Sequence, residues 1–91
     1  MSIEEDIAEV TDSVKDLLIR KNRKYGNSAL NPSRVFSKAN AIEQLKVRID
    51  DKLSRIAQGH GEDPDEDTIM DLMGYLVLLK IANKRVSDGE K

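Results

Sequence analysis

Two aspartates and a tyrosine recur at four-residue intervals in a stretch that is otherwise mostly apolar. Asp67, Asp71 and Tyr75 share one face if this stretch is helical, because residues four apart lie one turn apart. A carboxylate in an apolar helix needs a partner, since leaving it buried and unpaired costs several kcal/mol. Asp67 and Asp71 could hold a hard cation such as Mg²⁺, or they could pair with cationic side chains for structure alone. The spacing leaves both interpretations open.

Cationic side chains that could bind phosphate occur earlier in the chain. Arg48, Asp51, Lys52 and Arg55 follow one another at spacings of three, one and three residues, which places them on one side of a predicted helix. Arginine presents a planar fork to phosphate oxygens, and lysine presents a point charge. A solvated face with internal ion pairs has the same pattern. The acidic strip of the later stretch favours the phosphate-binding interpretation, because it could lie opposite these cations.

A third segment combines positive charge, an aromatic ring and small polar groups. Residues 20–34 include five basic residues and no acid, and most of them fall in a predicted loop. Such a loop suits a phosphate and a stacked base. An ordinary helix stop, with the tyrosine covering the core, fits the same residues. The candidate ligand-binding residues of this segment are Lys21, Lys24, Tyr25, Gly26, Asn27 and Ser28.

The candidate site residues lie on or between predicted helices, which are indicated by the periodic spacing of apolar residues. Ser2 and Glu5 have the spacing of a capping box, and apolar residues then recur at helical spacing, so the first helix is expected over about residues 3–22. Residues 23–36 are expected to be mostly loop, with a short helical turn at Asn31.

Two further helices follow. The second is expected from about residue 38 to Gly59, which should act as its C-cap. The third is expected to begin at Asp63 and Pro64, an N-cap residue followed by a proline at the first helical position. The fold class is therefore all-α, a small bundle of three main helices and one short turn.

The third helix is apolar almost all round, so it should be the central helix or part of a subunit interface. A chain of 91 residues buries only about 60–65% of the surface of its unfolded form, so association would stabilise it. We expect a dimer or higher homo-oligomer built from one helical domain over residues 1–86, with residues 87–91 as a frayed tail.

Composition narrows the classes of function. The chain has no cysteine, which excludes disulfides and thiolate sites, and its net charge of −2 is unlike that of a general nucleic-acid binder. The acidic start is unlike a signal peptide, and no stretch has membrane-spanning length, so a cytoplasmic location is expected. His60 lies between two glycines with no second histidine, so we nominate no catalytic residue.

The candidate segments together resemble a known family more specifically than any one of them does. Their motifs, in order, are Lys21-Asn22-x-x-Tyr25-Gly26-Asn27-Ser28, Arg48-x-x-Asp51-Lys52-x-x-Arg55 and Asp67-Thr68-x-x-Asp71-Leu72-x-x-Tyr75. This ordered set resembles the phage and prophage family called nucleotide modification associated domain 1, over about residues 15–82. That family looks like a distant relative of the MazG-like all-α nucleoside triphosphate pyrophosphohydrolases. The resemblance implies a helical nucleotide-binding fold, often oligomeric, in a phage or bacterial setting.

The chain departs from the hydrolase pattern at one important place. MazG-like enzymes hold Mg²⁺ against a triphosphate with a helix that carries Glu-Glu-x-x-Glu, or a near equivalent, and with Glu-x-x-Asp on the next helix. Here the second helix offers only Glu43, Asp50 and Asp51 among cations, so the full acidic cage is absent.

Three functions remain open from the sequence. The first is binding of a phosphorylated nucleotide, including sequestration of a cyclic-nucleotide signal of host defence, with no certain cofactor. The second is Mg²⁺-dependent pyrophosphohydrolysis, with the metal held by Asp67 and Asp71. The third is a non-catalytic structural or interaction module. A long nucleic acid and a membrane are not expected partners.

Overall fold

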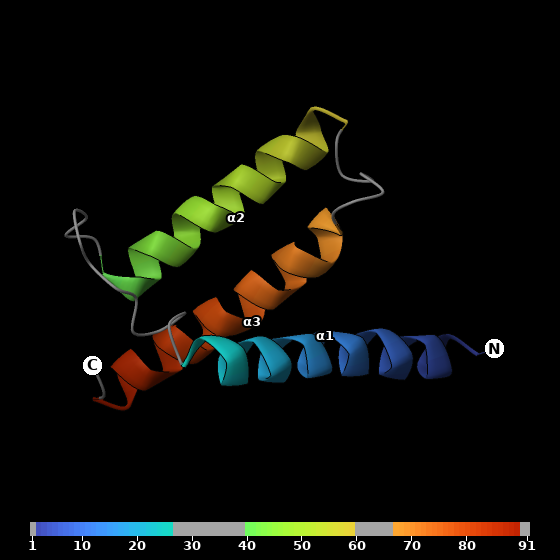
Figure 1. The fold of residues 1–91 in the computed structure, drawn as a ribbon, viewed down its shortest axis with the longest axis horizontal. Coiled ribbons are helices and arrows are strands. Elements are labelled where there is room, and N and C mark those ends of the chain that lie inside the picture. Colours follow the sequence, from blue (N-terminus) through green and yellow to red (C-terminus); the bar gives the residue numbers. More distant parts are fainter. Residues whose placement is uncertain (1, 27–39, 60–66, 90–91) are drawn as a thin grey trace.

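The computed structural model describes residues 2–26, 40–59 and 67–89. Within this part of the chain the structure has three α-helices and no strand: α1 (Ile3–Tyr25), α2 (Ala41–Ala57) and α3 (Thr68–Ser87). The helices α2 and α3 run antiparallel and side by side, and α1 crosses α3 obliquely (Figure 1). The predicted all-α class is confirmed. The short helical turn expected at Asn31 lies outside the described residues.

The start of α1 follows from its capping box. The Ser2 side chain accepts a hydrogen bond from the Glu5 backbone N–H at 3.1 Å and donates one to the Glu5 carboxylate at 3.2 Å. Acidic side chains in the first turn also complement the positive N-terminal end of the helix dipole. The sequence-based prediction of this helix start is confirmed.

The end of α1 differs from the prediction. The helix continues through Tyr25, whereas the sequence pattern predicts its end near residue 22 and a loop after it. The terminator is Gly26, which adopts φ 60° and ψ 49° and donates its N–H to the Asn22 carbonyl. Asn22 to Lys24 have no property that forbids a helix, and basic residues in the last turn favour it. Lys21, Lys24 and Tyr25 therefore project from a helix and not from a loop.

The other two helices begin at residues whose side chains cap them. Asn40 accepts the Glu43 N–H at 2.9 Å, so α2 begins slightly later than expected. It ends at Ala57 with Gln58 in the C-cap position, where Gly59 was predicted, because the Gln58 backbone N–H already bonds to the Ser54 carbonyl. Asp67 accepts the Met70 N–H at 2.9 Å and caps α3. The helix therefore begins at Thr68, later than the predicted start at Asp63 and Pro64, because the Asp67 side chain provides the cap; residues 63–64 themselves lie outside the described part of the chain.

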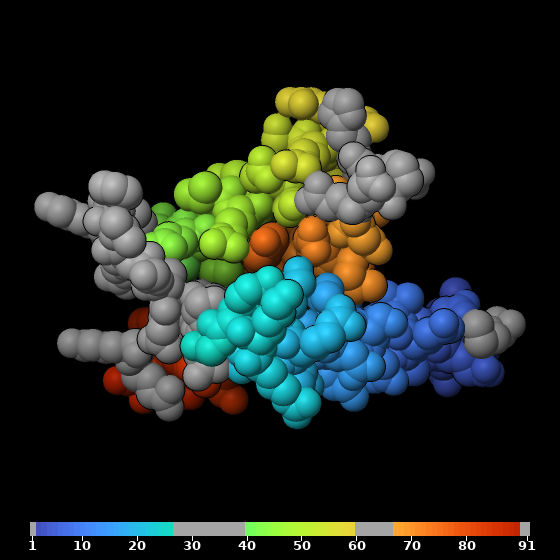
Figure 2. Space-filling view, in the orientation of Figure 1, coloured from blue at the N-terminus to red at the C-terminus, as the bar shows by residue number. Residues whose placement is uncertain are grey.

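The helix α3 is central, as predicted, because it packs against both α1 and α2. Among the described residues the buried apolar core is small and is drawn from all three helices; its members are Val14, Leu45, Ile49 and Ala82. The helices α1 and α3 are in close contact at Gly74, where an added Cβ would lie 3.1 Å from Leu18 Cδ2. Figure 2 shows α3 between the other two helices, with the N-terminal half of α1 extending beyond them. None of the described helices is both long and apolar enough to cross a membrane.

Candidate functional site

A hollow of about 190 Å³ lies where the C-terminal half of α1 meets α3, with one side chain of α2 at its edge. Its charged and polar lining comes from all three helices and includes Lys21, Arg48 and Asp71. Two tyrosine rings, Tyr25 from α1 and Tyr75 from α3, complete the polar wall. The apolar lining consists of Leu17, Leu18, Gly74 and Leu78. Segments far apart in the sequence therefore converge on one pocket.

Asp71 is the only carboxylate among the described residues of this lining, and two ammonium groups approach it from opposite helices. The Lys52 Nζ of α2 lies 3.5 Å from Asp71 Oδ2, and the Lys21 Nζ of α1 lies 4.0 Å from Asp71 Oδ1. The Lys52 side chain is 11% exposed and that of Asp71 is 22% exposed, whereas Lys21 is largely in solvent. Asp71 thus links α1, α2 and α3 through charge.

Arg48 is the cation that stands at the edge of the pocket. Its guanidinium carbon lies 5.9 Å from the centre of the Tyr75 ring, within the range of a cation–π contact. Arg48 forms no ion pair with any described carboxylate, and its residue is exposed. The ring holds the side chain in place while its N–H donors remain open to an anion.

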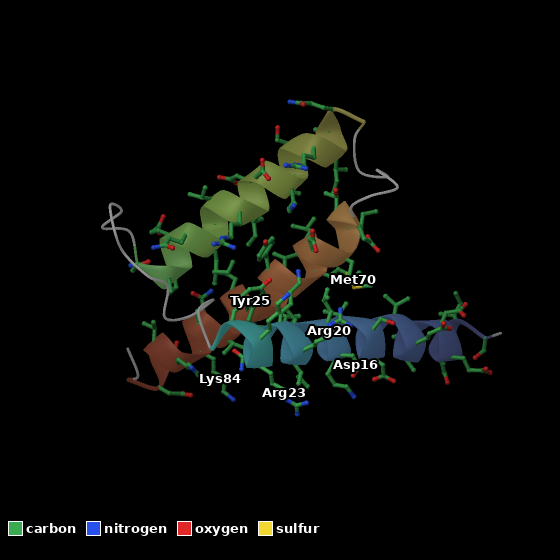
Figure 3. All side chains as sticks on the ribbon, viewed as in Figure 1. Asp16, Arg20, Arg23, Tyr25, Met70 and Lys84 are labelled. Carbon is green, nitrogen blue, oxygen red and sulfur yellow. The ribbon has the colours of Figure 1, made fainter. Side chains whose placement is uncertain are left out.

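Tyr25 provides a second aromatic surface at the other side of the pocket. The residue is 57% exposed, and Lys24 Nζ lies 5.3 Å from its ring centre. Figure 3 shows Tyr25 at the end of α1 nearest α3, and Arg23 projecting from the opposite side of α1. Lys24 supports the tyrosine but does not line the pocket. An exposed ring beside cations can stack on a flat polar ligand such as a nucleobase.

The charge balance of the pocket favours an anion. The described lining has two cations, Lys21 and Arg48, and one carboxylate, Asp71, and the Lys52 ammonium group also lies 3.5 Å from Asp71, so positive charge is in surplus. This surplus sits beside an apolar floor, where water screens charge less than it does in bulk solvent. The chain as a whole has a net charge of −2, so the positive region is local.

Other nominated residues lie away from this pocket. Arg55 Nε pairs with Asp51 Oδ2 at 3.3 Å along α2, with both side chains about half exposed. Neither residue lines the hollow. Gly26 acts as the C-cap of α1, and Asn27 and Ser28 lie outside the described residues. The nominated cationic face of α2 is therefore divided, because Arg48 and Lys52 contact residues of α3 and the Asp51–Arg55 pair lies along α2 itself.

The two aspartates nominated for metal binding have other partners. An Asp67 oxygen caps α3, and both Asp71 oxygens face lysine ammonium groups. Among the described residues, no group of three or more histidine, cysteine, aspartate or glutamate side chains is placed to hold a metal ion. The ammonium groups beside Asp71 would oppose a bound Mg²⁺, which demands an octahedral oxygen environment. Metal binding by this pair remains a sequence-based prediction.

Several pocket residues were not nominated from the sequence. Asn22 appears within the first motif but was not selected, and Gly74 gave no signal beyond its unusual position inside a helix. Leu17, Leu18 and Leu78 were not nominated for the site either. Their exposure to a pocket depends on the crossing of α1 over α3, which no local pattern encodes.

Comparison of the chain with protein-family models, with curated proteins and with solved structures gave no significant match.

Proposed function

We propose that this chain binds a phosphorylated nucleotide in the pocket between α1 and α3. The observation that carries the proposal is that Arg48, oriented by Tyr75, and Lys21 border one pocket with the exposed ring of Tyr25. Arginine and lysine recognise phosphate, and an aromatic ring stacks on a base. The apolar floor adds contact area for the base or the sugar.

The size of the pocket limits what it can enclose. A volume of about 190 Å³ is below the roughly 300–1,000 Å³ of sites that surround a whole drug-sized ligand. One part of a nucleotide, a base or a phosphate group, would lie inside the hollow while the rest remained near the surface. A pocket of this size therefore suits a protein that binds part of a nucleotide and leaves the remainder exposed at the surface.

Capture without hydrolysis is the form of the proposal that the described residues support. Cations outnumber carboxylates at the pocket, and Asp71 is held by lysines on both sides. We assign no residue to the activation of water. In a phage-type protein of the family that the motifs resemble, such capture would sequester a nucleotide, including a cyclic-nucleotide signal, in the host cytoplasm.

We also propose that the chain acts as a homo-oligomer. Large apolar side chains remain well exposed on the described helices, with Ile3 at 72% and Ile7 at 57% on α1 and Leu76 at 47% on α3. Together with the small core, this exposure supports burial against further copies of the chain.

A nucleotide panel tests the binding proposal. The purified chain would be heated with nucleoside mono-, di- and triphosphates and with cyclic nucleotides, each with and without Mg²⁺, while product formation is followed by chromatography. The expected result is a rise in Tm with at least one nucleotide and no product, because a ligand that binds only the folded state stabilises it. Release of pyrophosphate would show that the chain hydrolyses the nucleotide, and it would contradict binding without hydrolysis. An unchanged Tm across the whole panel would contradict nucleotide binding and favour a structural module.

A further inference from the structure

The first turns of α1 carry an apolar stripe that no described segment covers. Ile3, Ile7 and Val10 recur at helical spacing and are 72%, 57% and 45% exposed. They continue the face whose later members, Val14 and Leu18, pack at α3. The stripe therefore has the same composition as a core face, but it lies in the half of α1 that extends beyond α2 and α3 (Figure 2).

This part of α1 is also strongly acidic. Residues 4–16 contain six acidic residues, and Lys15 is their only base. Glu4 and Asp6 lie on either side of the apolar stripe, by their helical positions relative to Ile3 and Ile7. A surface that receives this segment must offer apolar contacts flanked by positive charge.

Such a surface occurs on α3, on a side that neither α1 nor α2 covers. A shallow groove of about 410 Å³ is lined there by Leu76, Leu79, Lys80, Asn83, Lys84 and Ser87. The groove combines an apolar end with two lysines, and Leu76 is 47% exposed. Residues 72–87 contain no acid, so the lysine charges are not offset within this stretch of the helix.

We infer that the N-terminal turns of α1 from a second copy of the chain occupy this groove. Ile3, Ile7 and Val10 would contact Leu76 and Leu79, while Glu4 and Asp6 would face Lys80 and Lys84. The segment cannot reach the groove of its own chain, because α1 is one continuous helix whose second half is already fixed on another side of α3. Two copies that each donate a helix and receive one form a closed assembly. The inference rests on the proposed self-association and is independent of nucleotide binding.

Exchange of charge between the two surfaces gives the sharpest test. In one variant, Glu4→Lys and Asp6→Lys reverse the charge beside the stripe; in a second, Lys80→Glu and Lys84→Glu reverse the groove. Each variant alone is expected to raise the dissociation constant of self-association by about tenfold or more, measured by sedimentation velocity. An equimolar mixture should regain wild-type affinity, because both contacts of a mixed pair then join opposite charges.

Apolar variants and a matched control complete the experiment. Ile7→Ser with Val10→Ser should weaken association to a similar degree, whereas Ile19→Ser, which alters an exposed isoleucine of the same helix off the stripe, should not. Circular dichroism would verify that every variant is folded. A wild-type chain that stays monomeric overturns both the proposed self-association and this surface. A wild-type oligomer that the variants leave intact, or a mixture that does not recover, overturns the surface alone.

Discussion

The Lys52 ammonium group of α2 lies 3.5 Å from the Asp71 carboxylate of α3, and both side chains are largely withdrawn from water. Because Lys52 is 8% exposed as a residue, it is the most buried charged group among the described core residues. The Asp71 carboxylate is also approached by Lys21 of α1, at 4.0 Å. The same carboxylate therefore lies near cations from both α1 and α2 and borders the candidate pocket.

Asp71→Ala is expected to destabilise the fold without any ligand. Removal of the carboxylate leaves the Lys52 charge in a mostly buried position without this partner, and we expect a loss of about 1–3 kcal/mol in the free energy of unfolding. Urea denaturation followed by circular dichroism measures the change. Asp51→Ala is the matched control. It removes the exposed ion pair between Asp51 and Arg55, which lies along a single helix and should contribute less than about 0.5 kcal/mol to the free energy of unfolding. Equal effects of the two substitutions would contradict the structural role of Asp71.

Arg48→Ala is expected to weaken nucleotide binding with little change in folding. The guanidinium is exposed, and a charged hydrogen bond to phosphate contributes about 1.5–3 kcal/mol, so affinity should fall about 10- to 100-fold. Titration calorimetry with the nucleotide found in the panel measures this change. Lys46→Ala removes a cation from the same helix that pairs with Glu43 and does not line the pocket, so its affinity should match wild type. If both variants bind alike, the pocket at Arg48 is not the nucleotide site.

Tyr25 is expected to contribute by stacking and not by its hydroxyl group. Tyr25→Phe should keep the wild-type affinity, whereas Tyr25→Leu should lose about 1–3 kcal/mol of binding free energy, the range found for stacking of a base on an aromatic ring. The ring is 57% exposed, so neither variant should lower Tm appreciably. Loss of affinity in the phenylalanine variant would indicate that the hydroxyl group makes the contact instead.

Gly74→Val is expected to separate α1 from α3. A Cβ at this position already lies 3.1 Å from Leu18 Cδ2, so a branched side chain forces a shift and should lower the free energy of unfolding by about 1–3 kcal/mol. Thermal and urea unfolding provide the measurement. Adding Leu18→Ala to the variant creates space at the same contact and should recover part of the loss. If the second substitution only adds to the first, the two residues do not share this contact.

Local features of the fold were predictable from the sequence. The Ser2 capping box and the helical periodicity of the three segments depend on residues within a few positions of one another, and the structure has these helices. The end of α1 was predicted too early because a run of basic and polar residues just before a helix-terminating glycine resembles a loop. Only Gly26, with its positive φ, terminates the helix.

The site was predictable only in part, because it depends on how the helices cross. Spacing indicated that Arg48 and Lys52 share a side of α2, but the depth of Lys52 and its pairing with Asp71 follow from the register of α2 against α3. The sequence could not distinguish these two residues from Arg55, which faces Asp51. The residues of the pocket floor could not be predicted from the sequence either, since Leu18 and Gly74 meet through tertiary contact alone.

The attachment of α1 by only its second half has a consequence for how the molecule opens. The long contact between α2 and α3 should protect their backbone amides from hydrogen exchange more than those of α1, whose first turns are exposed to solvent. Detachment of α1 from α3 would thus be the sub-global opening that requires the least free energy. The pocket lies along this seam, so a nucleotide bound there would join the loosely held helix to the antiparallel pair and slow the exchange of its amides.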